Sequence, residues 1–287
     1  MNHLLHSTRF RPLLALLLSL SCAGGLFAQP LRAPEPVVDP SRSPYRSPPD
    51  LEVLPDEKWD QINGSVARAL AWLASQQDPD GSYPTHIGGR PGVTALATLA
   101  FLSAGRLPGE GPDGATINKG IDYVLASQRP DGMFLVDSTS MPATNFDRGA
   151  HTGLYNHAVS SLMLCEAYGL VDEKRQGKIK PAIERAITFA RKMQLRTQRF
   201  PDDKGGFRYV KSMNLFAGKG DADLSVTGWF VMFYRAAKNA GFEVPKQYID
   251  DAIAFVRRCY DPPSGAFYYG LHGHDRDSVG RAMTGAG

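Results

Sequence analysis

The sequence predicts an all-α fold in which helical hairpins build a double-layered barrel. A turn motif recurs four times after about residue 56, and helices with one apolar face alternate with helices that are apolar almost all round. Of the 287 residues, 43% are hydrophobic and 21% charged, a balance that excludes a disordered chain. A formal net charge of +3 and only 3 cysteines give no support for a nucleic-acid partner or a disulfide scaffold.

The first 28 residues have the layout of a secretory signal peptide. Arg9 and Arg11 precede an apolar run at 13–20, and small residues then lead to Ala28, after which we expect cleavage. The alternative is an uncleaved membrane anchor, but the run is short for a bilayer, and no transmembrane span is expected after its removal. We therefore expect an exported protein, either periplasmic or extracellular.

Residues 29–55 are expected to form a tether between the signal peptide and a domain at 56–287. Seven prolines fall within residues 29–50. Proline fixes φ and lacks an amide donor, so this stretch cannot build a helix or a central strand. It is typical of an extended linker.

The turn motif consists of an aromatic and an aliphatic residue, then Gln, Gly and a second aromatic residue. The copies at 72–83 and 123–134 share the spacing Gln-x-x-x-Gly-x-aromatic. The copy at 189–207 is stretched, and in the copy at 255–267 Tyr260 replaces the Gln. We expect a helix to end near each Gln, the Gly to adopt a left-handed conformation, and the Gln amide to tie the turn to a neighbouring helix end.

Two kinds of helix alternate between these motifs. The amphipathic kind appears at 62–76 and 179–187, where aliphatic residues recur at helical spacing. The nearly uncharged kind appears at 92–104, 153–169 and 224–237. A helix that is apolar all round must be buried on all sides, so this alternation predicts an outer layer around an inner layer.

The recurring Gln-x-x-x-Gly-x-aromatic motif resembles the QW motif of squalene and oxidosqualene cyclases, and the resemblance covers roughly 60–287. Their superfamily includes protein prenyltransferase β subunits, so the resemblance implies an α/α toroid. Residues 223–229 also resemble exported bacterial proteins described as containing prenyltransferase or squalene oxidase repeats. The family's toroid closes with about six hairpins. This chain has room for about four, so we expect an incomplete arc, apparently truncated at the C-terminus, with a further inner helix starting near residue 282.

The same resemblance implies a catalytic acid. Squalene–hopene cyclases protonate an alkene with an Asp-x-Asp-Asp motif at the start of an inner helix, and residues 221–224 read Asp-Ala-Asp-Leu. By motif position the resemblance implies Asp223 as the proton donor, with Asp221, the first Asp of the motif, as a second candidate catalytic residue. Leu224 replaces the last Asp, which leaves the acid without its usual neighbour. The alternative is that Asp223 or Ser225 caps the helix, where backbone donors need partners.

Four inner-helix residues are candidates for contact with a ligand in the concave centre: His157, Tyr155, Trp229 and Phe233. Aromatic faces can stabilise a cation. The alternative for the aromatic residues is ordinary core packing, and for His157 a hydrogen-bonded place in the core.

We expect no metal and no cofactor. The Asp-x-Cys element of the zinc-dependent prenyltransferases is absent before Cys165 and Cys259, which are instead expected to be buried thiols. The polar run 272–277 has residue types that suit a metal, but it lies in a loop, where charged groups are ordinarily solvated.

Our leading hypothesis is an exported toroid that binds a hydrophobic small molecule or a protein partner in its centre, with self-association to complete the barrel. The alternatives are a terpene cyclase using Asp223 as general acid and, by fold analogy, a polysaccharide-active enzyme. A dry aromatic cavity with Asp223 pointing inward favours the cyclase, and a polar groove with paired carboxylates favours a sugar. Asp223 bonded to its own helix amides favours a structural role.

Overall fold

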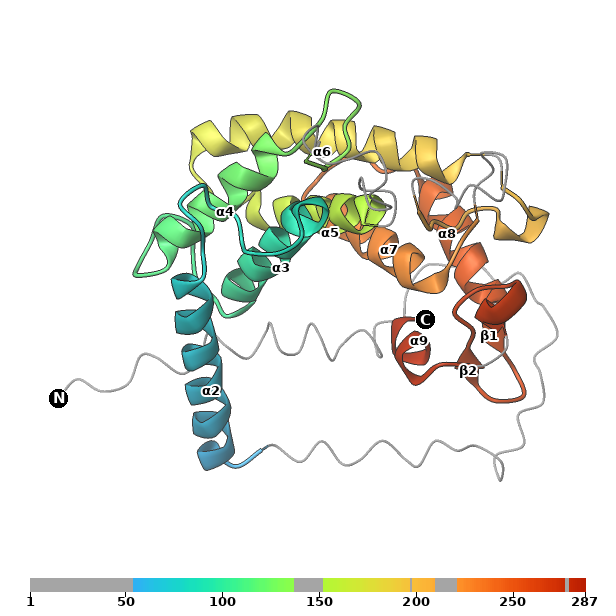
Figure 1. Ribbon diagram of the computed structural model, residues 1–287, viewed down its shortest axis with the longest axis horizontal. Coiled ribbons are helices and arrows are strands. Elements are labelled where there is room, and N and C mark those ends of the chain that lie inside the picture. Colours follow the sequence, from blue (N-terminus) through green and yellow to red (C-terminus); the bar gives the residue numbers. More distant parts are fainter. Residues whose placement is uncertain (1–53, 137–151, 197, 210–220, 277–278) are drawn as a thin grey trace. The chain divides into compact units, whose positions relative to one another are not determined.

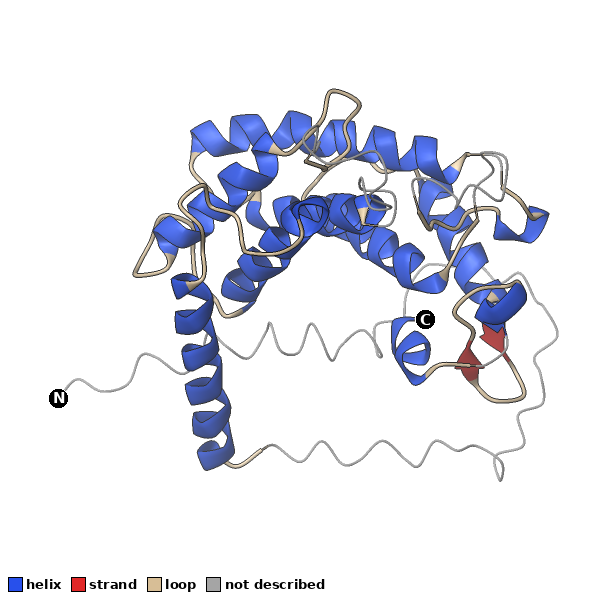
Figure 2. Cartoon of the chain, viewed as in Figure 1, coloured by secondary structure: helices blue, strands red, loops and turns tan. Residues whose placement is uncertain are grey.

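The computed structural model describes residues 54–136, 152–196, 198–209, 221–276 and 279–287. The expected signal peptide and most of the expected tether lie outside this part of the chain. Two compact units are present, residues 1–69 and 70–287. The described residues form eight α-helices and one antiparallel two-stranded hairpin, which confirms the all-α fold (Figures 1 and 2).

The helices and strands in chain order are α2 (Asp56–Ser75), α3 (Arg90–Ser103), α4 (Gly114–Ala126), α5 (Gly153–Ala167), α6 (Glu173–Gln194), α7 (Leu224–Asn239), α8 (Lys246–Arg258), β1 (Tyr260–Asp261), β2 (Ala266–Phe267) and α9 (Arg281–Ala286).

Within residues 70–287 the helices alternate between two layers. In the inner layer α5 packs against α3 on one side and α7 on the other, and the short α9 packs against α7. In the outer layer α4 packs on α3, α6 on α5 and α7, and α8 on α7 (Figure 1). This is the arrangement that the alternating patterns predict, and α9 stands where a further inner helix is expected.

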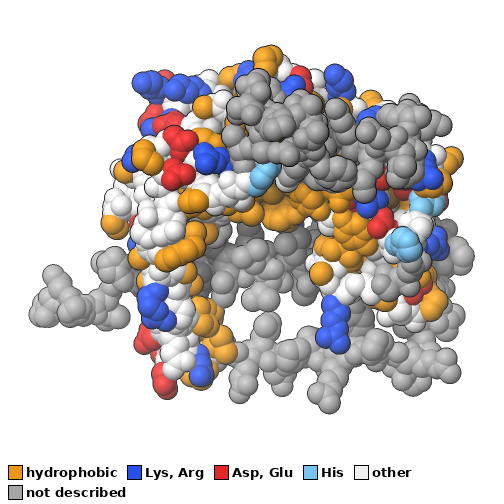
Figure 3. All heavy atoms as spheres, in the orientation of Figure 1, with side chains coloured by type: hydrophobic (Ala, Val, Ile, Leu, Met, Phe, Trp, Pro, Cys, Tyr) orange, Lys and Arg blue, Asp and Glu red, His pale blue; other side chains and the backbone are white. Residues whose placement is uncertain are grey.

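Burial differs among the inner helices. In α5 only Tyr155, Leu162 and Glu166 escape full burial. In α3, by contrast, Val93 and Leu96 remain 36% and 45% exposed, and in α7 Met232 remains 40% exposed. Burial on all sides is therefore correct for α5, whereas α3 exposes two apolar side chains and α7 exposes one. Figure 3 shows hydrophobic side chains gathered in this region.

The motif glycines adopt the expected left-handed conformation, with φ of +89° at Gly81, +94° at Gly132, +90° at Gly205 and +66° at Gly265. L-residues with a Cβ rarely adopt this conformation, so glycine is needed in all four turns.

In three of the turns the Gln amide clamps two carbonyl groups. It donates to the carbonyl of its own motif glycine and to a carbonyl of the next outer helix, which confirms the expected role. The clamps join Gln77 to Gly81 and Thr116 (3.1 and 2.9 Å), Gln128 to Gly132 and Ala182 (3.0 and 2.8 Å), and Gln194 to Gly205 and Tyr248 (3.0 and 2.9 Å). One detail differs, because Ala182 lies well inside α6 rather than at its end.

A second repeated contact joins three of the turns to the inner helix that follows. The amide of the aromatic residue donates to a threonine hydroxyl in three of the four copies. The pairs are Tyr83 with Thr94, Phe207 with Thr227 and Phe267 with Thr284, at 3.1, 2.9 and 3.2 Å. Because Thr284 belongs to α9, this helix is the counterpart of α3 and α7.

Candidate functional site

A group of charged side chains lies at the N-terminal end of α7. Arg208 faces three carboxylates: its Nη1 atom is 2.6 Å from Asp275 and 3.3 Å from Asp221, and its Nε atom is 3.4 Å from Asp223. We call these four residues the Arg208 cluster. Burial alone lowers the pKa of the guanidinium, but the three carboxylates outweigh this effect and raise it.

Local backbone pairing explains why these residues meet. Asp223 donates its amide to the carbonyl of Phe207 at 3.0 Å, so the residue that follows the third turn lies beside the start of α7. The amide of Leu224 donates to the backbone carbonyl of Tyr269 at 2.7 Å, which attaches the segment after β2 to the start of α7. Asp275 reaches the same place from the 3-10 turn Gly273–Arg276.

Asp223 is fully buried, and its two carboxylate oxygens have different surroundings. Oδ1 accepts hydrogen bonds from the Val226 amide at 2.8 Å and from the Ser225 hydroxyl at 2.7 Å. Oδ2 accepts no hydrogen bond in the described structure and has only the ion pair with Arg208. Burial raises the pKa of Asp223 to about 6, while the Val226 amide, the Ser225 hydroxyl and Arg208 act in the opposite direction. The structure thus places Asp223 as the N-cap of α7.

The repeat provides an internal comparison for this carboxylate. The residues that precede α3, α5 and α9 are Gly89, Thr152 and Gly280, and none of them caps its helix with a side chain. The inner position of the toroid therefore does not require a capping carboxylate. Asp223 is an addition to the repeat, and it comes together with Arg208.

Three hydroxyl groups adjoin the carboxylates. Because the Ser225 hydroxyl donates to Asp223, the Tyr155 hydroxyl, 2.6 Å from Ser225 Oγ, is the donor in their shared hydrogen bond. The Tyr269 hydroxyl lies 3.4 Å from Ser225 Oγ. Burial raises the pKa of both tyrosines, so they remain protonated donors at neutral pH.

A second buried carboxyl, Asp203, lies next to the Arg208 cluster. Burial raises its pKa to about 6; His272 lowers it, and the nearby Asp221 raises it further. His272 Nε2 is 3.2 Å from Asp202 and 3.7 Å from Asp203. The ring of His272 also stacks on Phe200 at 3.8 Å.

The sequence reasoning missed Arg208 and Asp203 as site residues. The available signal was the stretched third motif, whose extra residues include Asp202 and Asp203. The polar run 272–277 has residue types that suit a metal, but the structure divides it between two groups, with His272 beside Asp203 and Asp275 beside Arg208. Asp277 lies outside the described residues. Among the residues that are described, no three His, Cys, Asp or Glu side chains are arranged to hold a metal ion.

The four candidate ligand contacts have different environments. His157 and Phe233 are fully buried. His157 Nε2 lies 3.1 Å from the Ala186 carbonyl of α6, and burial lowers the His157 pKa to about 4, so the ring is neutral at physiological pH. Tyr155 and Trp229 are partly exposed, and only Tyr155 belongs to the polar site. A ligand-binding role for these four residues remains a prediction, and the placement of His157 and Phe233 fits the core alternative.

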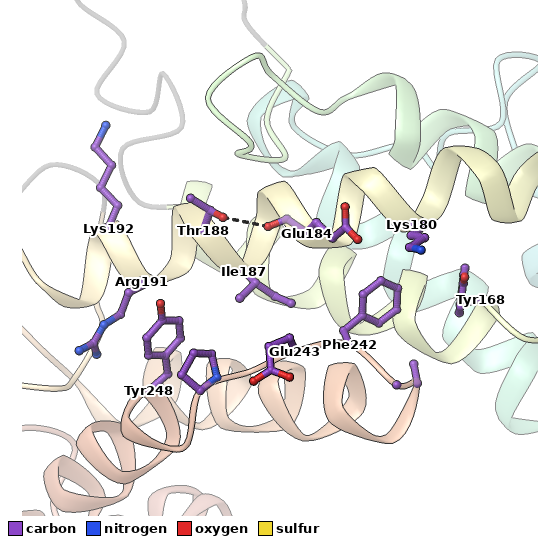
Figure 4. A pocket seen from close by; sticks show the side chains of 13 residues that line it. Tyr168, Lys180, Glu184, Ile187, Thr188, Arg191, Lys192, Phe242, Glu243 and Tyr248 are labelled. Carbon is purple, nitrogen blue, oxygen red and sulfur yellow. Dashed lines mark hydrogen bonds between the residues drawn. The ribbon is translucent and has the colours of Figure 1, made fainter.

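A cavity of about 630 Å³ lies elsewhere, between α6 and the connection from α7 to α8 (Figure 4). Tyr168, Ile187, Phe242 and Tyr248 line it, and Arg191 stands over the Tyr248 ring at 4.4 Å. None of the Arg208 cluster lines this cavity, so it is not part of the polar site.

Two further expectations concern the described residues. Cys165 and Cys259 are buried free thiols, as expected. No helix in the described part of the chain combines the length and the hydropathy that crossing a bilayer requires.

Comparison with known proteins supports the fold. No protein-family model matches the chain, and no curated protein matches it. Among solved structures, the chain is similar to a family 105 glycoside hydrolase from C. acetobutylicum ATCC 824, with a TM-score of 0.52, 12% sequence identity, and coverage of 80% of this chain and 69% of that chain. Membership of the terpenoid cyclase and protein prenyltransferase superfamily, which the turn motif suggests, remains a prediction. The chain is an α/α-toroid protein.

Proposed function

We propose that this chain is an exported α/α-toroid protein that binds a neutral carbohydrate at the Arg208 cluster. The observation that carries the proposal is the buried Asp223, a capping carboxylate that the other inner helices lack, held against Arg208 with one oxygen free of hydrogen bonds. A buried charge is costly unless it is paired, and here the pairing brings a guanidinium, two further carboxylates and a hydroxyl together at one helix end.

The charges indicate the class of ligand. One guanidinium faces three carboxylates, so the cluster carries excess negative charge and disfavours an anionic ligand. Partly exposed carboxylates and tyrosine hydroxyls are suited to the hydroxyl groups of a sugar, because they accept and donate hydrogen bonds in fixed directions. The structural similarity to a glycoside hydrolase adds support from the fold alone.

Burial separates the roles of the two aspartates. The Asp221 side chain is 18% exposed and is placed to contact a ligand. The Asp223 side chain is 0% exposed and is covered by Arg208, so we assign it to positioning Arg208 and Ser225. The same cover argues against Asp223 as the acid of a terpene cyclase, because an alkene-protonating acid must be neutral and must reach its substrate.

A glycan array followed by calorimetry on the full chain tests the proposal. We expect a neutral oligosaccharide to bind and Asp221→Asn to weaken it at least tenfold. Asp172→Asn is the matched control, because Asp172, like Asp221, ion-pairs with an arginine, but it does so with Arg175 on the outer helix α6. If no neutral glycan binds, or if Asp221→Asn binds as well as the unaltered protein, the proposal is wrong.

Two added measurements separate the alternatives. Release of reducing ends from the bound glycan would extend the activity to glycoside cleavage. Isoprenoid lipids that co-purify with the protein, together with product formed from squalene, would overturn the carbohydrate proposal in favour of the cyclase. For export, N-terminal sequencing of the secreted protein is expected to begin at Gln29, and an intact N-terminus would contradict the expected cleavage.

A further inference from the structure

The outer helices share a short pattern that places one surface of each against the preceding turn. The pattern is counted back from the first aromatic residue of the turn motif that follows each helix. Seven positions before it stands the residue whose backbone carbonyl can accept a Gln amide, and six positions before it stands a β-branched residue. A small residue and an aliphatic residue stand three and two positions before it. The last three of these positions are Ile117, Gly120 and Ile121 in α4; Ile183, Ala186 and Ile187 in α6; Ile249, Ala252 and Ile253 in α8; and Val66, Ala69 and Leu70 in α2.

In α4, α6 and α8 this segment receives a turn from the preceding motif. The carbonyl just before the β-branched residue accepts the Gln clamp in all three helices. The motif glycine packs against the helix backbone two positions after the β-branched residue, and a Cβ on the glycine would overlap that backbone. The backbone positions are Lys119, Arg185 and Asp251. The chain therefore contains three copies of the same junction between a turn and a helix.

Among the described residues, no helix packs on the fourth turn in this way. No atom approaches within 4 Å of a Cβ built on Gly265, in contrast to the three other motif glycines. Tyr260, which stands in the Gln position, is 43% exposed. The surface that meets an outer helix in the first three repeats is thus open to solvent in the described part of the fourth.

Helix α2 shows the complementary feature. Val66 is 40% exposed, although its counterparts Ile117 and Ile183 are fully buried in their junctions. Ala69 is also exposed, whereas its counterpart Ala252 is fully buried. The pattern for receiving a turn is present in α2, and two of its three positions, Val66 and Ala69, are exposed, whereas Leu70 is buried.

We propose that α2 of one copy docks on the fourth turn of a second copy, head to tail. The interface would resemble the junction that the chain already makes three times, with Ser65 in the place of Thr116 and Arg68 in the place of Arg185. Tyr260 replaces the clamping Gln of the fourth turn, so the contact would rest on the packing of Gly265 against the α2 backbone and not on an amide clamp. A contact of this kind joins different surfaces of two copies, and it builds a ring if the rotation closes.

A second copy is a better occupant than α2 of the same chain. Gln77, which follows α2, is clamped to α4, whereas Gly265 follows α8, and the clamps order these outer helices as α4, α6 and α8. In the inner layer α5 separates α3 from α7. In the order of the clamps, α2 precedes α4 and the fourth turn follows α8.

Sedimentation of the full chain over a range of concentrations tests the association. We expect the unaltered protein to associate with rising concentration, and Ala69→Arg to lower the association constant at least tenfold. Ala67→Arg is the matched control: it adds the same charge two positions away, at the exposed counterpart of Glu184 and Asp250. A protein that stays monomeric throughout, or an Ala69→Arg variant that associates like Ala67→Arg, would overturn the proposal.

Cross-linking identifies the surfaces. Oxidation of a mixture of Arg68→Cys and Tyr260→Cys proteins should give a disulfide-linked dimer, and neither protein alone should do so. Cys165 and Cys259 are buried and do not compete, and Cys22 is replaced by serine in both proteins. If the double variant instead forms the disulfide within a single chain, or if the mixture stays unlinked, docking on a second copy is wrong.

Discussion

At the scale of single residues, Asp223 and Asp203 stand out because the fold buries two carboxyls a short distance from one guanidinium. Burial raises the pKa of each to about 6. Both carboxyls thus change charge close to neutral pH, although an ordinary Asp does so near 3.8. The polar site is therefore sensitive to small changes of acidity.

Stability should rise on mild acidification. The pKa of both groups is higher in the folded state than in the unfolded state, so the folded state binds these protons more tightly. The stability gained from this is complete below the unfolded pKa and is lost as the pH rises through about 6. We expect the two groups together to increase the free energy of unfolding by about 2–3 kcal/mol from pH 7.5 to pH 5. Urea unfolding measures it.

The variant Asp223→Asn isolates one of these groups. An asparagine keeps a capping oxygen but cannot titrate, so the rise in stability should shrink. Asp172→Asn is the control, since the hydrogen bonds of that exposed cap lower the pKa of Asp172 and its titration falls at more acidic pH. An unchanged pH profile in Asp223→Asn would show that Asp223 is not the titrating group.

Each motif glycine that touches a helix should tolerate substitution worse than the one that does not. In Gly132→Ala the new Cβ meets the Arg185 carbonyl and also forces a left-handed alanine. Gly265→Ala adds only the second cost, about 1–2 kcal/mol. We expect Gly132→Ala to lose at least twice as much stability in urea unfolding, and equal losses would mean that the close approach carries no energy.

At the scale of elements, the Gln clamp holds consecutive hairpins together. On folding, the Gln amide gives up hydrogen bonds to water and donates two hydrogen bonds to carbonyl groups of different elements. Each clamp thereby fixes a turn against the helix of the next repeat, in addition to the apolar packing between the layers.

Gln77→Ala should lower the free energy of unfolding by about 1–3 kcal/mol, because two part-buried carbonyls lose their donor. The adjacent Gln76→Ala is a matched control, since the exposed Gln76 side chain donates a 3.2 Å hydrogen bond to its neighbour Ser75 and joins no second element through it. Thermal and urea unfolding of the two variants provide the comparison. Similar losses would show that the clamp adds nothing beyond helix propensity.

The elements were more predictable from sequence than the site. The turns at Gly81 and Gly132 depend on contacts within a few residues, and the apolar periods of the helices are visible in the chain itself. The Arg208 cluster combines residues 208, 221, 223 and 275, which only the packed structure brings together. A helix start is a local feature of the sequence, so the sequence predicts Asp223 as a candidate site residue. No local pattern marks Arg208 as its partner.

At the scale of the whole molecule, head-to-tail docking would make stability depend on concentration. A partner that binds only the folded chain stabilises it by mass action. The melting temperature should therefore rise with protein concentration in the unaltered protein and stay constant in Ala69→Arg. Differential scanning fluorimetry at several concentrations measures the effect, and a constant melting temperature in both proteins would contradict it.

The third clamp also shows where this architecture can accept new sequence. Gln and the clamped glycine are four residues apart in the first two turns and eleven apart in the third, yet both hydrogen bonds are kept. The clamp thus encloses a loop whose length is free to change while its ends stay fixed. The third loop contains Asp203, so added residues there brought a new acidic group to the polar site without moving a helix. Loop grafts between Gln and Gly are the natural route for giving other repeats a chemistry of their own.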